Sequence, residues 1–445
     1  MALPAEPSSG RVQAAPQACG LRRRYLQDEN LRRSRRINTV VPFSLDARVC
    51  RANSGPDIEW NPCYQTYLDR VDRLSKFRST RPTSVPAGFP SEVKAPWVWS
   101  GSDIADDNYI VRLSCDEILE IEQSLANFKK KYEGYLELDE VTPLTFPLPR
   151  LERRLRAIAH TLHSGIGFAV LRGLDPQKYS ASDNVIIYLG VTSYIAERRG
   201  CQDSSGNMLI HVKDLGDSIP DSELRQSPYA HNAQPFHNDV CDILAMYVQN
   251  QAIDGGESHI ASCAKVYNEI AASRPDVIHT LAEPNWIFDK HRTPAFWNTR
   301  ALLFNFEGNG PGFCFSRRPI TGSPTSPRSP DVPPMTEVQA EAIDMVHFTA
   351  MKHKLTMRLE RGDIQLINNL AIQHARSAFR DGHDQRRHII RLWLRNEELA
   401  WKTPEGLKQT WFEKYGDSER RKVARWNIFP GASRERVLFR SDSCT

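Results

Sequence analysis

Two histidines and one aspartate have the residue types and the order of a metal site. His237 and Asp239 stand two residues apart, and His374 follows far downstream in the chain. Two imidazoles and one carboxylate can hold one face of an octahedral iron(II) ion and leave three positions open for a co-substrate and O2. If the three side chains meet in space, the sequence predicts an oxygen-activating enzyme. A His-x-Asp pair alone is a weak signal, because many such pairs lie in turns or at the surface.

Strands are needed to bring these side chains together. Residues two apart on a strand point to the same face, so His237 and Asp239 are predicted to face one point while Asn238 faces away. His374 is expected on a second strand. Alternation of apolar residues and flanking turn residues predict strands at 168–173, 242–252, 257–263, 302–306, 313–316, 363–370 and 387–395.

Helices are predicted around these strands. Ser114 and Glu117 form a capping box ahead of an apolar helical pattern that reaches Phe128. Residues 321–334 are rich in proline and serine and are predicted to form an exposed loop or lid. The other predicted helices are 63–77, 151–162, 183–197, 264–273, 275–283 and 336–360.

The composition indicates a soluble intracellular protein. The formal net charge of +4 is accounted for by the arginine-rich first residues, so the body needs no nucleic-acid or membrane partner. The nine cysteines are scattered without a CxxC pair, which argues against a disulfide framework or a structural zinc site. No apolar run approaches the roughly 18 residues of a membrane span. We expect a cytoplasmic location, and the arginine runs at 22–24 and 32–36 leave a mitochondrial presequence as the alternative.

The 445 residues suit either one large decorated domain or two domains. We predict a basic extension at 1–55, a helical and loop region at 56–144 that packs on the core, a catalytic domain at 145–396 and a C-terminal extension at 397–445. The aromatic residues expected to pack this last extension back on the body are Trp411, Phe412, Trp426 and Phe429.

The full order of features is more specific than the His-x-Asp pair. The turn Gly255-Gly256 and then Ser258 come about twenty residues after the pair, and a strand that carries arginines follows His374. Over roughly 145–396 this order resembles the taurine dioxygenase/TfdA-like family of iron(II)- and 2-oxoglutarate-dependent oxygenases, which includes clavaminate-synthase-like proteins. The resemblance implies a mainly β fold with flanking helices. Its core would be a double-stranded β-helix, or jelly roll, of eight strands, in which early and late strands meet at one mouth.

The resemblance also implies a role for each residue of the pattern. The residues that match the family's iron ligands are His237, Asp239 and His374. Arg387 matches the arginine that binds the distal carboxylate of 2-oxoglutarate, and Ser258 stands where the family usually has an assisting threonine. Arg391 matches a second arginine that positions the co-substrate or an anionic group of the substrate. The implied cofactors are Fe(II), 2-oxoglutarate and O2.

Elementary chemistry agrees with these roles. A dicarboxylate co-substrate needs a fixed cation, and guanidinium offers a bidentate fork. An arginine on a buried strand would be costly without such an anion. The predicted reaction is oxidation of a small organic substrate with release of succinate and CO2. Hydroxylation is the default outcome, and desaturation or ring formation is the alternative.

Other polar residues near the pattern have simpler interpretations. His231 is interpreted as a loop histidine rather than a substrate group, and His259 as structural. Arg376 and Arg380 are close to His374 but could equally face solvent. Arg317 and Arg318 are interpreted as a solvated strand end rather than a substrate contact. His383 is interpreted as a surface residue and His388 as a sheet-packing residue. Asn368 and Asn369 are interpreted as turn-forming residues, and Cys241 and Cys263 as small residues of the core.

Two other functions stay open from the sequence. One is a catalytically silent binding module with the same fold, and the other is a hydroxylase or demethylase that acts on proteins. The expected partner is a small-molecule substrate, without nucleic acid or membrane, and a homo-oligomer is left open. The sequence does not name the substrate, because loop residues without a readable code select it.

Overall fold

The computed structural model describes residues 58, 60–77, 81–133, 137–216, 227–290, 296–323, 327–418 and 422–429. The extension predicted at 1–55, with its two arginine runs, lies outside the described residues. No helix in the described part of the chain is long and apolar enough to cross a membrane.

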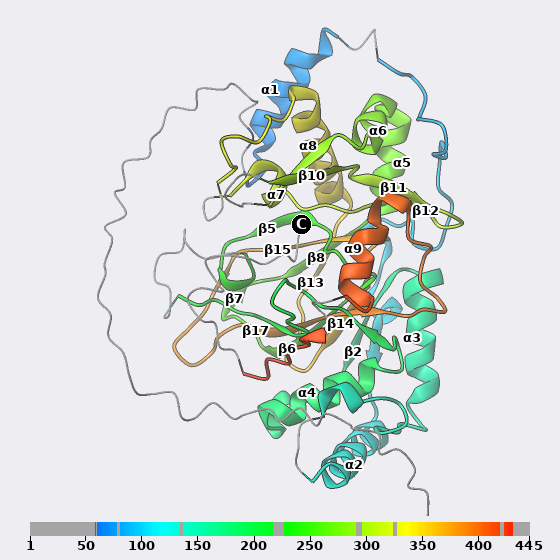
Figure 1. Ribbon diagram of the computed structural model, residues 1–445, viewed down its shortest axis with the longest axis vertical. Helices are drawn as coiled ribbons and strands as arrows, with labels where there is room; N and C mark the ends of the chain where they lie inside the picture. Colours follow the sequence, from blue (N-terminus) through cyan, green and yellow to red (C-terminus); the bar gives the residue numbers. More distant parts are fainter. Residues whose placement is uncertain are drawn as a thin grey trace, which may run out of the picture. The chain divides into compact units, whose positions relative to one another are not determined.

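Two facing β-sheets form the centre of the fold (Figure 1). The larger sheet has the strand order β1 (Ile110–Arg112), β2 (Phe168–Arg172), β14 (Ile364–Asn368), β6 (Ile243–Asn250), β17 (His388–Arg395) and β3 (Arg198–Arg199), and β4 (Ile210–Val212) also pairs with β17. The smaller sheet has the order β13 (Leu355–Met357), β8 (Ser258–Ser262), β15 (Ile372–Arg376) and β5 (Gln234–His237). Strands β2, β14, β6 and β17 with the four strands of the smaller sheet give the eight core strands of a jelly roll, as predicted.

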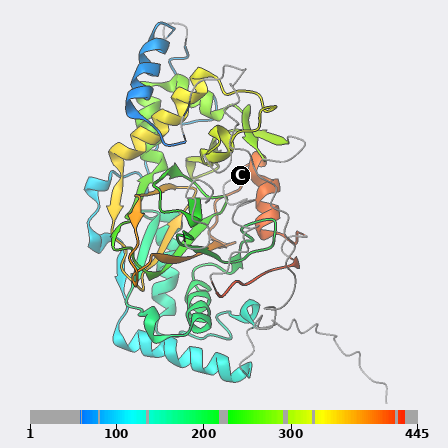
Figure 2. The same cartoon turned by 90° about the vertical axis from the view of Figure 1, so that its left-hand side faces the viewer.

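Helices cover the outer face of each sheet, and the two views agree on this layering (Figures 1 and 2). α3 (Glu152–Ser164) and α4 (Ala181–Thr192) pack on the larger sheet, and α2 (Cys115–Lys131) packs on α4. α5 (Cys263–Ser273) and α8 (Glu337–His353) pack on the smaller sheet, and α6 (Pro275–Ala282) packs on these two helices. The remaining helices are α1 (Tyr64–Ser75), which lies along α8, α7 (Arg318–Thr321) and α9 (Glu405–Tyr415). Short antiparallel ladders join β9 (Trp286–Asp289) to β10 (Trp297–Arg300), β11 (Leu303–Phe306) to β12 (Gly310–Phe313), and β7 (Asp254–Gly255) to β16 (Phe379–Arg380).

The strands of the larger sheet are apolar on both faces because each face is buried. In β17, Ile390 and Leu392 join the core formed with the outer helices, whereas Trp393 joins the core between the two sheets. The side-chain period of two therefore sends Arg391, like Trp393, toward the inside of the jelly roll. The functional residues are carried by this inner surface.

The capping box of Ser114 and Glu117 is present at the start of α2, as predicted.

Two other predicted helices end earlier than expected. The helix predicted at 336–360 instead ends at His353, because Leu355 and Met357 pair with β8 as strand β13. The helix predicted at 183–197 ends at Thr192.

The C-terminal aromatic residues follow the prediction only in part. Trp411 is buried and its Nε1 donates to Asp242 Oδ1 at 2.8 Å, and Trp426 is buried as well. Phe412 and Phe429, by contrast, are 53% and 70% exposed. Phe412 directly follows Trp411 on α9, so it lies on the helix face that points away from the body.

Candidate active site

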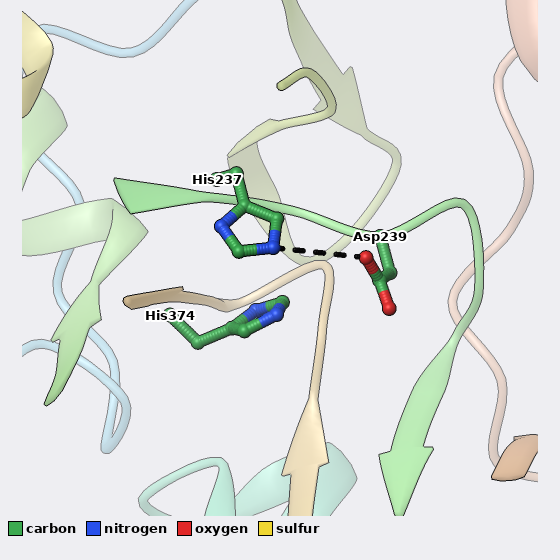
Figure 3. Close-up of side chains that lie close together, drawn as sticks. All are labelled: His237, Asp239 and His374. Carbon is green, nitrogen blue, oxygen red and sulfur yellow. Dashed lines mark ion pairs between the residues drawn. The ribbon is translucent and has the colours of Figure 1, made fainter. Parts of the chain in front are cut away.

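The two histidines of the sequence pattern are direct cross-strand neighbours. His374 on β15 pairs with His237 on β5, and their ring centroids are 4.1 Å apart. Asp239 lies beside them, so that ligand atoms of all three residues fall within 4.8 Å of one another (Figure 3). Among the described residues this is the group of buried acidic and histidine side chains that could hold a metal ion.

Asp239 is not on a strand, which corrects the sequence-based prediction. Strand β5 ends at His237, and Asp239 follows in an irregular turn. Asn369 holds this turn: its Oδ1 accepts from the Asp239 N–H at 3.0 Å, and its Nδ2 donates to the carbonyl of Asp239 at 2.6 Å. Asn238 faces away from the ligands, as predicted, and donates to the carbonyl of Asn369 at 2.6 Å. The interpretation of Asn369 as a residue that satisfies turn backbone is therefore confirmed.

Two inner-face residues of β17 hold the Asp239 carboxylate, which is fully buried. Arg391 Nη1 lies 2.9 Å from its Oδ2, and Trp393 Nε1 donates to the same oxygen at 3.1 Å. Burial alone would raise the pKa of Asp239, but the Arg391 guanidinium and the hydrogen bond from Trp393 hold that pKa below its usual value. The carboxyl is thus ionised, as a metal ligand must be.

Both histidines are neutral and have nitrogen lone pairs to offer. Burial lowers the pKa of His374 to about 3 and also lowers the pKa of His237. His237 Nδ1 lies 2.9 Å from the carbonyl of Pro235, which fixes it as the donor and leaves Nε2 with its lone pair, 3.8 Å from Asp239 Oδ1. A backbone hydrogen bond of this kind sets the tautomer of metal-binding histidines in proteins.

The two histidines open on a cavity whose empty space, counted together with the open solvent at its mouth, is about 850 Å³. His237, His374, Ser258, Arg387 and Arg391 all line it. The structure therefore brings the predicted residues together around one cavity, and Asp239 lies next to it, paired with Arg391.

Arg387 and Ser258 both line this cavity. Arg387 is 8% exposed, and its Nη1 is buried without a hydrogen-bond partner among the described residues. Gly256 has a φ of +77°, and a Cβ there would come within 3.2 Å of the Arg387 side chain, so the glycine makes room for it. Ser258 Oγ exchanges hydrogen bonds with Gln365 of the opposite sheet, at 3.0 and 3.2 Å.

These side chains fit iron and 2-oxoglutarate. Two neutral imidazoles and one carboxylate form an open three-ligand set, which suits iron(II) and leaves positions for other ligands. The buried Arg387 supplies a cation with an unused donor, which suits a carboxylate.

Several neighbouring residues differ from their sequence-based interpretation. Arg317 and Arg318, interpreted as a solvated strand end, are 1% and 6% exposed and line the cavity, because the chain turns into α7 and packs them inward. Arg376, which was left open, is buried on the cavity wall, whereas Arg380 is exposed. His231, by contrast, lies in a loop, as interpreted, beside Asp214 at 3.2 Å.

The other interpreted histidines have structural or surface roles, as predicted. The His259 ring bridges Thr356 and Ser377, both at 3.0 Å. His388 lies 2.8 Å from His211 across the β17–β4 pair, and His383 is exposed.

Sequence reasoning missed three residues that shape the site. Trp60 lines the cavity from the segment before α1, and Gln365 joins Ser258. Trp393 binds Asp239 and stands two residues after Arg391, so the strand period could have identified it. The other two have partners far away in the chain, and no local signal points to them.

Comparisons with known proteins agree with this geometry. The family model described as taurine catabolism dioxygenase TauD, TfdA family matches residues 135–393. The taurine hydroxylase-like protein SAT17 of Stachybotrys chartarum is 36% identical over 324 residues, which are 70% of this chain and 82% of that protein. The FR-33289 synthase of Streptomyces rubellomurinus is 26% identical over 262 residues, 56% of this chain and 75% of that protein.

The fold is also found among solved structures. Asparagine oxygenase, solved in complex with Fe(II), 2S,3S-3-hydroxyasparagine and succinate, matches 64% of this chain and 93% of its own with a TM-score of 0.51 at 17% identity. That likeness concerns the fold, and the family rests on the sequence matches. The chain belongs to the TauD/TfdA family and is an iron(II)- and 2-oxoglutarate-dependent dioxygenase.

Proposed function

We propose that His237, Asp239 and His374 bind the catalytic Fe(II). The observation that carries this proposal is the convergence of their ligand atoms within 4.8 Å, beside the cavity that His237 and His374 line. All three side chains are at least nine-tenths buried, so the arrangement is held by the fold. Two neutral imidazoles and one ionised carboxylate leave the other side of the metal to ligands that enter through the cavity.

Arg387 binds the distal carboxylate of 2-oxoglutarate in this proposal. Burial lowers the pKa of Arg387 to about 10, so its guanidinium is still protonated at neutral pH. Its buried Nη1 has no partner among the described residues, and a carboxylate oxygen would satisfy it. Ser258 offers a hydroxyl in the same cavity. Arg391 forms an ion pair with Asp239, and its buried Nη2 is available as a donor to a further anion.

The substrate we propose is a small organic molecule that is hydroxylated, with desaturation or ring closure as alternative outcomes. Bound iron supplies the redox chemistry by which O2 oxidises 2-oxoglutarate to succinate and CO2 and then oxidises the substrate. The protein orients the reactants and keeps bulk water away. Apolar side chains line much of the cavity for this purpose: Trp60, Val212, Met246, Leu359 and Ile389.

The test is succinate formation by the purified chain with Fe(II), 2-oxoglutarate and O2. We expect 2-oxoglutarate turnover that rises with the correct small molecule, and its loss in Asp239→Ala. A silent binding module would release no succinate under any of these conditions. Full turnover in Asp239→Ala, or turnover without iron, would contradict the proposal.

A further inference from the structure

A second arginine, Arg376, lies beside the proposed carboxylate site without a role in the proposed function. It is two residues after His374 on β15, and its register partner on β8 is Ser258. Arg376 lines the same cavity as Arg387 and is 5% exposed. Strand pairing therefore places this side chain next to the hydroxyl that is expected to assist the co-substrate.

The two guanidinium groups lie around one aromatic ring. The Cζ atoms of Arg376 and Arg387 are 4.9 and 5.2 Å from the centroid of the Phe379 ring. Phe379 belongs to β16, which pairs with the Gly255 turn. The two Cζ atoms are therefore at most about 10 Å apart, and two like charges at such a separation in a buried place are unfavourable unless an anion joins them.

Among the described residues neither guanidinium forms an ion pair, although Asp381 accepts from the backbone N–H of Arg387 at 2.8 Å. Arg376 Nη2 donates to the backbone carbonyls of Ala230 and Asn232, which fixes the side chain. Its Nε and Nη1 are buried and have no partner among the described residues, and the same holds for Arg387 Nη1. Burial and the neighbouring Arg387 lower the pKa of Arg376, and Asp214 and Asp381 oppose this shift only in part.

We propose that Arg376 and Arg387 together form a two-arginine site for the distal carboxylate of 2-oxoglutarate. This inference rests on the proposed function and adds Arg376 to its co-substrate site. A carboxylate has two oxygens with lone pairs for several donors, so it can satisfy both guanidinium groups at once. The shared Phe379 ring and the Ser258 register place Arg376 at the co-substrate end, which favours 2-oxoglutarate over the primary substrate as its anion.

The experiment compares two ligands that differ only in the distal carboxylate. Binding of 2-oxoglutarate and of 2-oxopentanoate to the Fe(II)-loaded full chain is measured by anaerobic calorimetry. Arg376→Gln is expected to weaken 2-oxoglutarate binding about tenfold to a hundredfold, as for the loss of a charge-assisted hydrogen bond. Its 2-oxopentanoate binding is expected to match that of the wild type.

The matched control is Arg300, another buried arginine outside the cavity. It donates to the carbonyls of Ala301 and Cys314, and its Cζ lies 4.0 Å from the centroid of the Phe288 ring, so like Arg376 it is a buried arginine held by backbone carbonyls and an aromatic ring. Arg300→Gln is expected to leave the ratio of the two dissociation constants unchanged. Arg376→Lys replaces Arg376→Gln in the experiment if the glutamine variant does not fold. Because lysine keeps a cation and an apolar stem, this variant is expected to lose less of the preference for 2-oxoglutarate over 2-oxopentanoate.

The outcomes separate this inference from the proposed function. If Arg376 variants weaken both ligands equally, or neither, Arg376 has only a structural role and the inference is wrong. If Arg387→Gln loses the preference for 2-oxoglutarate while the Arg376 variants keep it, only the two-arginine site fails. If the wild-type chain does not bind 2-oxoglutarate in the presence of Fe(II), the proposed function itself fails.

Discussion

At the scale of single residues, the site depends on a pair of neighbouring asparagines with different tasks. Asn369 bonds to the backbone N–H and carbonyl of Asp239 and so fixes the turn that carries the carboxylate. Asn368 instead donates to the carbonyl of Leu162 and accepts from the Leu370 N–H. Both side chains are buried, but only Asn369 contacts the residue that we propose as a ligand.

This difference predicts a selective effect on metal binding. Asn369→Ala is expected to raise the dissociation constant for Co(II) about tenfold or more, because groups that orient a metal ligand typically affect affinity by this amount. Asn368→Ala is the control, and its affinity for Co(II) is expected to be that of the wild type. Titration of the metal-free protein measures both, and equal losses in the two variants would show that the asparagines act only through stability.

The sequence could identify much of this site because its spacing is local. His237 with Asp239, and Arg387 with Arg391, lie close together in the chain, where residue type and period are readable. Trp60 and Gln365 were missed, since their roles depend on segments far apart in the sequence. The burial of Arg317 could not be predicted either, because its partner Asp344 belongs to a helix that begins later in the chain.

At the scale of elements, α1 is fastened to α8 by buried charges. Arg70 on α1 is 1% exposed, and its side chain lies 2.7 Å from Asp344 and 3.0 Å from Glu337. Asp344 also binds Arg317 of the cavity wall at 2.8 Å. The N-terminal helix, which lies outside the region matched by the family model, is therefore connected to the site through one carboxylate.

Arg70→Met is expected to lower the free energy of unfolding by about 3 kcal/mol, because it leaves the buried Asp344 with less compensation. Arg73→Met is the control. Arg73 is exposed and lies 3.4 Å from the same Glu337, so its loss is expected to cost about 0.5 kcal/mol or less. Urea unfolding measures both values. A similar small effect for the two variants would show that the buried network contributes little.

At the scale of the whole molecule, the proposed metal site connects both sheets. The proposed ligands come from β5, β15 and the turn after β5, and the groups that hold Asp239 come from β17 of the other sheet. A ligand that binds only the folded chain raises its stability, by about 2.7 kcal/mol at a hundred times its dissociation constant.

Metal removal is therefore expected to lower the melting temperature. Protein treated with a chelator is predicted to have a lower melting temperature than the same protein with Mn(II). The melting temperature of Asp239→Ala is predicted not to change when metal is added. Thermal unfolding followed by circular dichroism provides the measurement. An equal shift in Asp239→Ala would place the stabilising metal elsewhere.

The central claim is that one buried centre holds iron and 2-oxoglutarate together. Its most direct test is the visible absorption of the anaerobic protein with Fe(II) and 2-oxoglutarate. We predict a metal-to-ligand charge-transfer band in the wild type that is absent in Asp239→Ala and needs higher 2-oxoglutarate in Arg387→Gln. A wild-type protein without this band, at concentrations that saturate both ligands, would contradict the account.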